Sequence, residues 1–176
     1  MALDLPAVAR DELSRWAGEL LGARPELRAV APASLHVTLA FLGWQDEEAL
    51  PEIASAALTP ASVVAAPRLS FGPVRAVPPR RPRLFALDLG DAGGRAAELQ
   101  RRVSDELEAG GWYIPERRPF WPHVTLARVR RGERRVAPLA GPPPALSFEA
   151  RELTLYRSIL RREGALYEPL GRAELA

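Results

Sequence analysis

The sequence predicts an α+β fold with antiparallel sheets, built from two similar lobes. The pentapeptide His-Val-Thr-Leu-Ala occurs at residues 36–40 and again at 123–127, and the tetrapeptide Ala-Leu-Asp-Leu occurs at residues 2–5 and again at 86–89. Strands and helices also mix in runs joined by short turns, which favours antiparallel sheets over a doubly wound parallel sheet.

The two repeated strings indicate an internal duplication. Their copies are separated by nearly the same number of residues, 84 for ALDL and 87 for HVTLA, and a helix lies between the two strings in both copies. This period is too long for a solenoid, so two lobes related by a pseudo-two-fold axis explain it best. We expect one bilobal domain over residues 1–176, with repeat units at about 1–74 and 83–135 and C-terminal strands at 145–172 that complete the sheets.

The first unit alternates strands with helices. Apolar residues recur at helical spacing up to Gly22, with Pro6 in the first turn, and a later segment begins with acidic residues that suit a helix dipole. The expected elements are a strand at 2–5, a helix at 8–22, an extended piece at 30–32, a strand at 35–43, a helix at 45–58 and a strand at 68–74.

The second unit repeats this order after a proline-rich loop at residues 78–82. Leu99, Val103 and Leu107 share one face of a helix that stops at a Gly-Gly pair. The expected elements are a strand at 84–89, a helix at 95–109, a strand from 123, a long surface loop at 130–144, and strands at 146–159 and 166–170.

Composition excludes several classes of protein. No apolar run approaches the ~20 residues that span a bilayer, and the N-terminal residues lack the pattern of a secretory signal, so we expect a cytoplasmic protein. The chain has no cysteine, which excludes disulfides, a thiolate nucleophile and Cys-type zinc sites. Neither a GxGxxG motif after a strand nor a P-loop motif is present.

The charge is unevenly distributed, although the net charge is only +2. Residues 1–74 hold five Arg against nine acids, whereas residues 75–135 hold fourteen Arg against eight acids. Every basic residue is Arg, whose planar fork suits phosphate. The basic middle segment fits an anionic partner such as RNA or a nucleotide, and it fits a solvated surface equally well.

The chain has two histidines, and each begins one HVTLA string. Because side chains alternate along a strand, His36 and Thr38 point to one face, and His123 and Thr125 do the same in the second copy. If the lobes are related by a two-fold axis, these faces can meet across a groove. One imidazole can then deprotonate water while the other protonates a leaving oxygen on phosphorus, each contribution being worth ~10²–10⁴-fold. The two hydroxyls can bind the phosphate oxygens.

Two other interpretations remain open at this point. The histidine of a single His-x-Thr strand usually has a packing role or a surface position. A duplicated string can also persist from the duplication alone, although mutational drift would then be expected to change some of its positions. A metal site is the other interpretation. Two histidines make a poor one because catalytic zinc usually takes three protein ligands, and the HVTLA strings contain no carboxylate. We therefore expect neither a metal nor another cofactor.

These strings resemble the 2H phosphoesterase superfamily, and within it the bacterial and archaeal RNA 2′,3′-cyclic phosphodiesterases, also called 2′-5′ RNA ligases. The resemblance covers nearly the whole chain. It implies a bilobal α+β fold with helices on the outer faces and a cleft between two antiparallel sheets. It also implies metal-independent hydrolysis of an RNA-terminal 2′,3′-cyclic phosphate to a 2′-phosphomonoester, with reversible 2′-5′ ligation as a related activity. The strings that carry it are ALDLP at 2–6, HVTLAFLG at 36–43, RPRLFALDL at 81–89 and RPFWPHVTLARV at 118–129.

The resemblance also implies roles for individual residues. His36 is the proton donor to the leaving ribose oxygen, and His123 is the proton acceptor that activates water. Thr38 and Thr125 bind the phosphate oxygens. Arg128 is a weaker candidate for phosphate contact, because strict alternation points it away from His123 unless the strand ends or twists there.

Aromatic residues near the motifs have two possible roles. Phe120, Trp121 and Tyr156 are candidates for stacking on a base, each with a core role as the alternative. Trp121 stands where the family commonly has a basic or small residue. Phe41 is expected in the core, because it follows Val37 and Leu39 at period two.

The expected partners are RNA ends or small cyclic nucleotides. We expect a monomer with no membrane association and no obligate protein partner. The alternative function is an RNA-end or cyclic-nucleotide binding protein with little hydrolytic activity.

Overall fold

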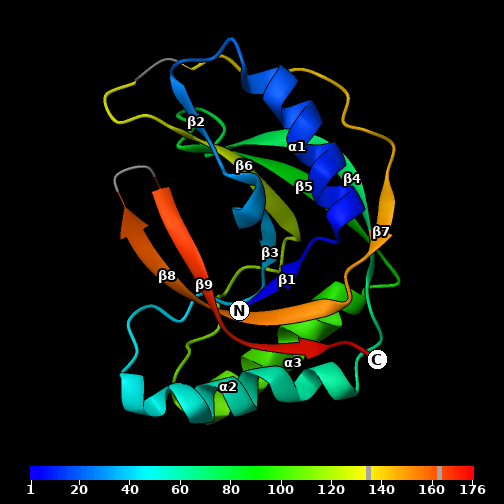
Figure 1. The fold of residues 1–176 in the computed structure, drawn as a ribbon, viewed down its shortest axis with the longest axis vertical. Helices are drawn as coiled ribbons and strands as arrows, with labels where there is room; N and C mark the ends of the chain where they lie inside the picture. The colour runs from blue at the N-terminus through cyan, green and yellow to red at the C-terminus, as the bar shows by residue number, and fades with distance from the viewer. Residues whose placement is uncertain (134–135, 162–163) are drawn as a thin grey trace.

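A computed structural model describes residues 1–133, 136–161 and 164–176. Its strands form one curled antiparallel sheet against which the helices pack (Figure 1). The predicted α+β fold class with antiparallel pairing is therefore confirmed. The strands are β1 (Ala2–Asp4), β2 (Leu27–Ala29), β3 (His36–Thr38), β4 (Arg68–Val77), β5 (Leu84–Ala92), β6 (His123–Val129), β7 (Ser147–Glu149), β8 (Glu152–Arg161) and β9 (Gly164–Glu174).

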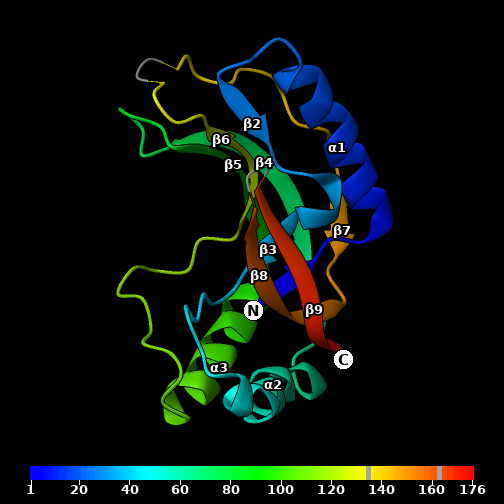
Figure 2. The same cartoon turned by 60° about the vertical axis from the view of Figure 1, so that its left-hand side comes forward.

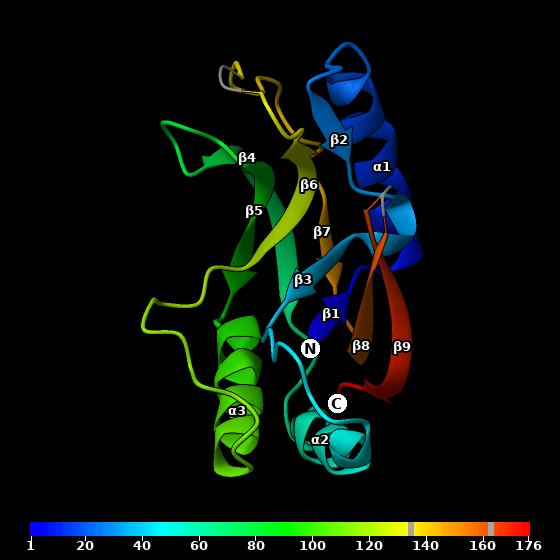
Figure 3. The same ribbon diagram turned by 90° about the vertical axis from the view of Figure 1, so that its left-hand side faces the viewer.

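The order of the strands is mirrored about the centre of the sheet. Along the described residues it runs β7-β4-β5-β6-β3-β1-β8-β9, and β2 also pairs with β6 (Figure 3). At the centre Val37 of β3 pairs with Val124 of β6. Both valines hold the same position in HVTLA, so a pseudo-two-fold axis passes between them. The two halves of the sheet meet edge to edge along β3 and β6. This order fits the predicted duplication, whose unit boundaries stay predictions.

The helices lie on two sides of the sheet. α2 and α3 lie side by side, with α2 against β8 and β9, whereas α1 lies beside β2 (Figures 1 and 3). Leu99, Val103 and Leu107 of α3 are fully buried, as their spacing predicts. The helices are α1 (Ala7–Leu21), α2 (Leu50–Leu58) and α3 (Arg95–Ala109), with short 3-10 turns η1 (Pro32–Ser34), η2 (Glu47–Ala49) and η3 (Thr59–Ser62).

The sheet curves along its length, and the β8–β9 hairpin extends along one side of it (Figure 2). The hairpin pairs in antiparallel register from Glu152↔Glu174 to Arg161↔Gly164, and β9 contacts η1, the turn that leads into β3. No helix in the described part of the chain is long and apolar enough to cross a membrane. The cytoplasmic location stays a prediction.

The first HVTLA strand is shorter than predicted. It ends at Thr38, because the backbone N–H groups of Leu39 and Ala40 both donate to the Met1 carbonyl. Leu39 and Ala40 are both buried, which breaks the alternation. The prediction that Phe41 lies in the core is therefore wrong, since its side chain is 74% exposed.

The strand predicted at residues 146–159 is two strands in different halves. Phe148 of β7 pairs with Leu69 of β4, whereas Leu153 of β8 pairs with Leu3 of β1. The chain crosses from one half to the other between these strands, where the Ala150 N–H donates to the Pro67 carbonyl. Local alternation continues through the crossing, so the sequence pattern does not reveal it. The extended piece predicted at residues 30–32 is likewise not a strand, since β2 ends just before it and η1 begins at its last residue.

Candidate active site

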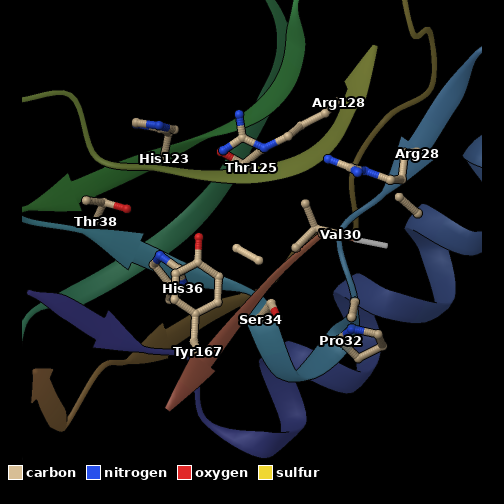
Figure 4. A pocket seen from close by; sticks show the side chains of 14 residues that line it. Arg28, Val30, Pro32, Ser34, His36, Thr38, His123, Thr125, Arg128 and Tyr167 are labelled. Carbon is tan, nitrogen blue, oxygen red and sulfur yellow. The ribbon is translucent and has the colours of Figure 1, made fainter. Parts of the chain in front are cut away.

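The two HVTLA strings meet in one pocket of about 290 Å³. His36 and Thr38 reach it from β3, and His123 and Thr125 reach it from β6 (Figure 4). The structure thus brings the four sequence-predicted side chains together. The other lining residues are Arg28, Ala29, Val30, Ala31, Pro32, Ser34, Arg128, Gly164, Ala165 and Tyr167.

The pairing at the centre of the sheet explains why the four side chains converge. Val37 and Val124 are antiparallel partners and are fully buried, so the residues on either side of each valine face the opposite surface. The same register places His36 toward Thr125, and it places Thr38 near the other imidazole. Neither copy of the motif could make this arrangement alone.

The His123 ring is held by its own preceding residues. Its Nδ1 lies 2.7 Å from the Trp121 carbonyl oxygen, which can only accept, so Nδ1 carries a proton. The Trp121 indole stacks on the imidazole, with ring centroids 4.1 Å apart and an interplanar angle of 15°. In the neutral ring Nε2 is therefore the free acceptor.

The His36 ring is held by aromatic residues from the C-terminal hairpin. Its centroid lies 4.8 Å from the ring of Tyr167, which meets it edge-on, and 6.0 Å from the ring of Tyr156. Burial lowers the pKa of His36 below its ordinary value, and the charges of the N-terminal amino group and of the second imidazole act in the same direction. A hydrogen bond with the Ser34 backbone and the Asp4 carboxylate oppose this shift in pKa.

Each of the two histidines has one aspartate as its partner on the neighbouring strand, and each aspartate comes from one ALDL string. Asp4 is the cross-strand partner of the first histidine, and its carboxylate accepts hydrogen bonds from Thr154 Oγ1 and Tyr156 Oη, both at 2.8 Å. Burial and the bond to Asp4 raise the pKa of Tyr156 to about 12. Asp88 is the cross-strand partner of His123. Its carboxylate accepts a 2.9 Å hydrogen bond from Trp121 Nε1 and forms an ion pair with Arg75.

Arg128 lines the pocket because of a β-bulge. In the β5–β6 ladder, Phe85 pairs with Ala127 while the next residue of β5 pairs with Thr125, so Leu126 has no partner there. Leu126 and Ala127 are consequently both buried. The alternation reverses after them, and the Arg128 side chain lies on the same face as Thr125 (Figure 4). Strict alternation from the sequence therefore fails at Arg128, as it does at Phe41.

Nine of the fourteen lining residues were not singled out from the sequence, and Arg28 and Tyr167 have the largest polar side chains among them. Arg28 lies on β2, a strand of three residues that is too short for a clear periodic signal. Tyr167 lies on β9, where the predicted strand gave no reason to single it out. Of the stacking candidates, Trp121 and Tyr156 face the imidazoles, and Phe120 packs against the core. None of these three candidates lines the pocket.

The pocket has few side chains that could ligate a metal ion. Among the residues that the structure describes, no group of three or more His, Cys, Asp or Glu side chains is placed to hold a metal ion. None of the described lining residues is acidic, whereas two are Arg and two are His. The pocket is thus suited to an anion.

Known proteins are similar to this chain in sequence and in fold. The RNA 2′,3′-cyclic phosphodiesterase of Aeropyrum pernix is 33% identical over 161 residues, which cover 85% of this chain and 87% of that one. The protein of the same name from Archaeoglobus fulgidus is 31% identical, over 97% and 96%. Among solved structures, TT0787 of Thermus thermophilus superimposes with a TM-score of 0.83 at 27% identity, and LigT of Escherichia coli complexed with 3′-AMP with 0.77 at 28%. Each comparison covers 99% of this chain and 95% of the other.

A family model extends the match from individual relatives to the family. The model of the 2′-5′ RNA ligase superfamily matches residues 5–161, which include both HVTLA strings and the strands from β2 to β8. The motifs, the strand order and this match agree. The chain belongs to the 2′-5′ RNA ligase superfamily of 2H phosphoesterases.

Proposed function

We propose that this protein hydrolyses the 2′,3′-cyclic phosphate at an RNA end to a 2′-phosphomonoester, with two histidines as general acid and base and no cofactor. The convergence of both His-x-Thr pairs in one pocket carries this proposal. The names of the relatives support it, since those of Aeropyrum pernix, Archaeoglobus fulgidus and Escherichia coli are all RNA 2′,3′-cyclic phosphodiesterases. Nucleotides are the expected ligands, because solved structures of Escherichia coli LigT hold 3′-AMP, NADP+ and ATP.

His123 is the proposed base. With the Nδ1 proton held by the Trp121 carbonyl, its Nε2 can take a proton from water. The water oxygen then bonds to phosphorus, and the bond from phosphorus to the ribose 3′ oxygen breaks. His36 gives its proton to that leaving oxygen. The two histidines exchange their protons with solvent before the next turnover.

Thr38 and Thr125 are the proposed ligands of the non-bridging phosphate oxygens. Their hydroxyls can donate to these oxygens, where negative charge must be stabilised in the transition state. Arg128 lies on the same wall and adds a positive charge beside Thr125. These three contacts stay proposals.

The lowered pKa of His36 matters for its role as proton donor. A donor must be protonated, and burial favours the neutral ring in the ligand-free pocket. A bound cyclic phosphate is an anion, and an anion close to an imidazole favours the protonated form. Substrate binding is therefore expected to raise the pKa of His36, so that the imidazole takes up a proton from solvent and can donate it.

The same groups can catalyse 2′-5′ joining. If a 5′-hydroxyl of a second RNA takes the place of water, the base and the acid keep their roles and a 2′-5′ linkage forms. The name of the superfamily supports this activity. A pocket that binds cyclic or 2′-5′ linked ends with little hydrolysis is the alternative function.

The test is incubation with EDTA and an oligonucleotide that ends in a 2′,3′-cyclic phosphate, followed by identification of the product. We expect a 2′-phosphate, formed by the wild type and lost in His36→Ala and in His123→Ala. Val8→Ala is the matched control, because Val8 is exposed on α1 at 73%. Binding without turnover in the wild type would support the alternative, and a requirement for added metal would contradict the two-histidine mechanism.

A further inference from the structure

One aromatic side chain covers the imidazole of His123 from outside the pocket. The Trp121 indole is stacked on that ring, with centroids 4.1 Å apart and an angle of 15° between the ring planes. His123 lines the pocket, whereas Trp121 does not. The indole therefore covers one face of the imidazole, while the imidazole itself still lines the pocket.

The local sequence produces this stack. Trp121 precedes His123 by two residues, and side chains two apart in an extended chain point to the same side. The residue between them is Pro122, and a residue before proline is restricted to extended conformations. The Pro122 carbonyl accepts a 2.9 Å hydrogen bond from the Leu89 N–H, which anchors the segment to β5 just before β6 begins. The stack is thus held by the backbone as well as by the rings.

Asp88 orients the indole. It is the direct partner of His123 in the β5–β6 ladder, and its carboxylate accepts a 2.9 Å hydrogen bond from Trp121 Nε1. Arg75 of β4 forms an ion pair with the same carboxylate, whose side chain is 14% exposed. The indole is therefore held at its nitrogen by a carboxylate that a third strand holds in turn.

The stack suits the form that His123 takes during the proposed reaction. When Nε2 takes a proton from water, the ring becomes an imidazolium. The positive charge then lies against the face of an indole, which is the aromatic ring that attracts cations most strongly. The contact is stronger after proton transfer than before it. An interaction that strengthens on the way to the transition state raises kcat rather than substrate affinity.

We propose that Trp121 is a positioning residue for the base His123. Its carbonyl oxygen, 2.7 Å from Nδ1, fixes the tautomer, and its indole fixes the plane of the imidazole and stabilises the imidazolium. Asp88 acts one step further away, because it orients the indole. This inference rests on the proposed function, since it takes His123 as the base that deprotonates water.

The first test is the hydrolysis rate of variants at the indole. Trp121→Leu keeps the backbone carbonyl and an apolar side chain but removes the aromatic face, so kcat is expected to fall about 5- to 30-fold. KM is expected to stay within about twofold of wild type, because interactions made in the transition state alone leave it unchanged. Trp121→Phe keeps an aromatic face and should recover most of kcat. Trp44→Leu is the matched control and keeps the wild-type kcat, because Trp44 is 99% exposed and lies outside the pocket lining.

A double-variant cycle separates positioning of the base from simple loss of packing. If Trp121 acts through His123, then adding Trp121→Leu to His123→Ala lowers the remaining kcat by about twofold or less. Loss of packing costs the same factor in both backgrounds. Long incubations at high enzyme concentration measure the remaining rate. NMR verifies the stack in solution, since the indole ring current shifts the ring protons of His123 upfield in the wild type and this shift is lost in Trp121→Leu.

Three results would overturn the positioning role. They are equal losses in the two backgrounds, a wild-type kcat in Trp121→Leu, and a raised KM with kcat unchanged. The proposed hydrolysis survives each of them, because the wild type still turns over the cyclic phosphate and His123→Ala does not. If His123→Ala keeps the wild-type rate, His123 is not the base, and the positioning role fails together with the proposed mechanism.

Discussion

The half-site of His36 and the half-site of His123 share one plan. In each, an aspartate from an ALDL string pairs across the strands with the motif histidine, namely Asp4 in the first and Asp88 in the second. Each aspartate accepts a hydrogen bond from an aromatic side chain that lies against the imidazole of its own half-site. The shared parts are those that the duplicated strings carry.

The half-sites differ in the origin of their aromatic neighbours. Trp121 lies two residues before its histidine and stacks at 4.1 Å, so the ring and the imidazole belong to one short segment. Tyr156 and Tyr167 come from the β8–β9 hairpin, far along the chain from the other histidine. The first half-site therefore depends on docking of the C-terminal hairpin, whereas the second depends mainly on local structure.

The charge beside the two histidines differs as well. The Asp4 carboxylate is bound by two uncharged hydroxyls, and it raises the pKa of His36 against the larger effect of burial. The Asp88 carboxylate forms an ion pair with Arg75, which offsets its charge. The two strings thus supply two equivalent imidazoles, and the differences between their neighbours give them unequal surroundings, which suits the proposed division into an acid and a base.

The largest expected effects distinguish the two histidines by role. Each His→Ala substitution lowers kcat by ~10²–10⁴-fold with an ordinary cyclic phosphate. In a substrate whose leaving 3′ oxygen is replaced by sulfur, the leaving group departs as a thiolate and needs no proton. With this substrate the loss in His36→Ala is expected to shrink to about tenfold or less, while the loss in His123→Ala persists. Stopped assays with both substrates measure this.

A reversed pattern would exchange the roles of the two histidines. If only His123→Ala recovered with the sulfur substrate, His123 would be the donor and His36 the base. The pH–rate profile alone does not decide this, because a bell-shaped curve has the same form whichever histidine is the acid.

Substitution of the central valines tests the packing where the two halves of the sheet meet, at β3 and β6. Val37 and Val124 are paired and fully buried, and truncating either to Ala is expected to cost about 2 kcal/mol of unfolding free energy. The two costs are expected to be nearly equal because the positions are equivalent. Urea unfolding measures them, with exposed Val8→Ala as a control within about 0.5 kcal/mol of wild type.

The double variant sharpens this comparison. Because the two valines are neighbours across the pseudo-two-fold axis, Val37→Ala and Val124→Ala together are expected to differ from the sum of the single costs by about 0.5 kcal/mol or more. Strict additivity would contradict a shared core at the joint, and it would mean that the two halves pack independently there.

Sequence periodicity predicts the site where the strands are regular and fails where they are not. Alternation holds across residues 36–38 and 123–125, and it correctly brings four side chains to one face. It fails at Phe41, because β3 has already ended, and at Arg128, because a bulge reverses the faces. Both failures arise from pairing partners that are distant in sequence and leave no local signal.

Charge counts along the sequence also have a limit. They indicate the basic middle segment, which contributes Arg128 to the pocket, but Arg28 belongs to the acid-rich first segment. Only the β2–β6 pairing brings these two cations together. Likewise, nothing in residues 146–159 reveals that β7 and β8 go to opposite halves of the sheet.

The aromatic hydrogen-bond donors to Asp4 and Asp88 are expected to differ in their contribution to stability. Tyr156→Phe removes a hydrogen bond to Asp4, which then keeps only the Thr154 hydroxyl among its described donors, at a cost of about 1.5–3 kcal/mol in stability. Trp121→Phe removes the indole donor to Asp88 but leaves the ion pair with Arg75, so a cost of about 1 kcal/mol is expected. Urea unfolding compares the two, and a larger cost for Trp121→Phe would contradict the charge difference between the half-sites.

The smallest expected effect is a shift in the titration of His36. Because burial favours its neutral ring, NMR titration of the ligand-free protein should give a midpoint below the ordinary histidine pKa of about 6.5. Addition of inorganic phosphate should raise this midpoint, since an anion in the pocket stabilises the imidazolium. The His36→Ala variant assigns the resonance.

Tyr167 can be tested as a cause of the lowered pKa of His36. The Tyr167 ring lies against His36, so Tyr167→Ala admits water and should move the midpoint upward, toward 6.5. Because the donor must be protonated, the same variant should move the high-pH fall of kcat/KM to higher pH. Tyr113→Ala, which changes a partly buried tyrosine outside the pocket lining, should leave both unchanged. If Tyr167→Ala leaves the His36 midpoint where it was, the hairpin does not tune this histidine, and the two half-sites are less unequal than their neighbours indicate.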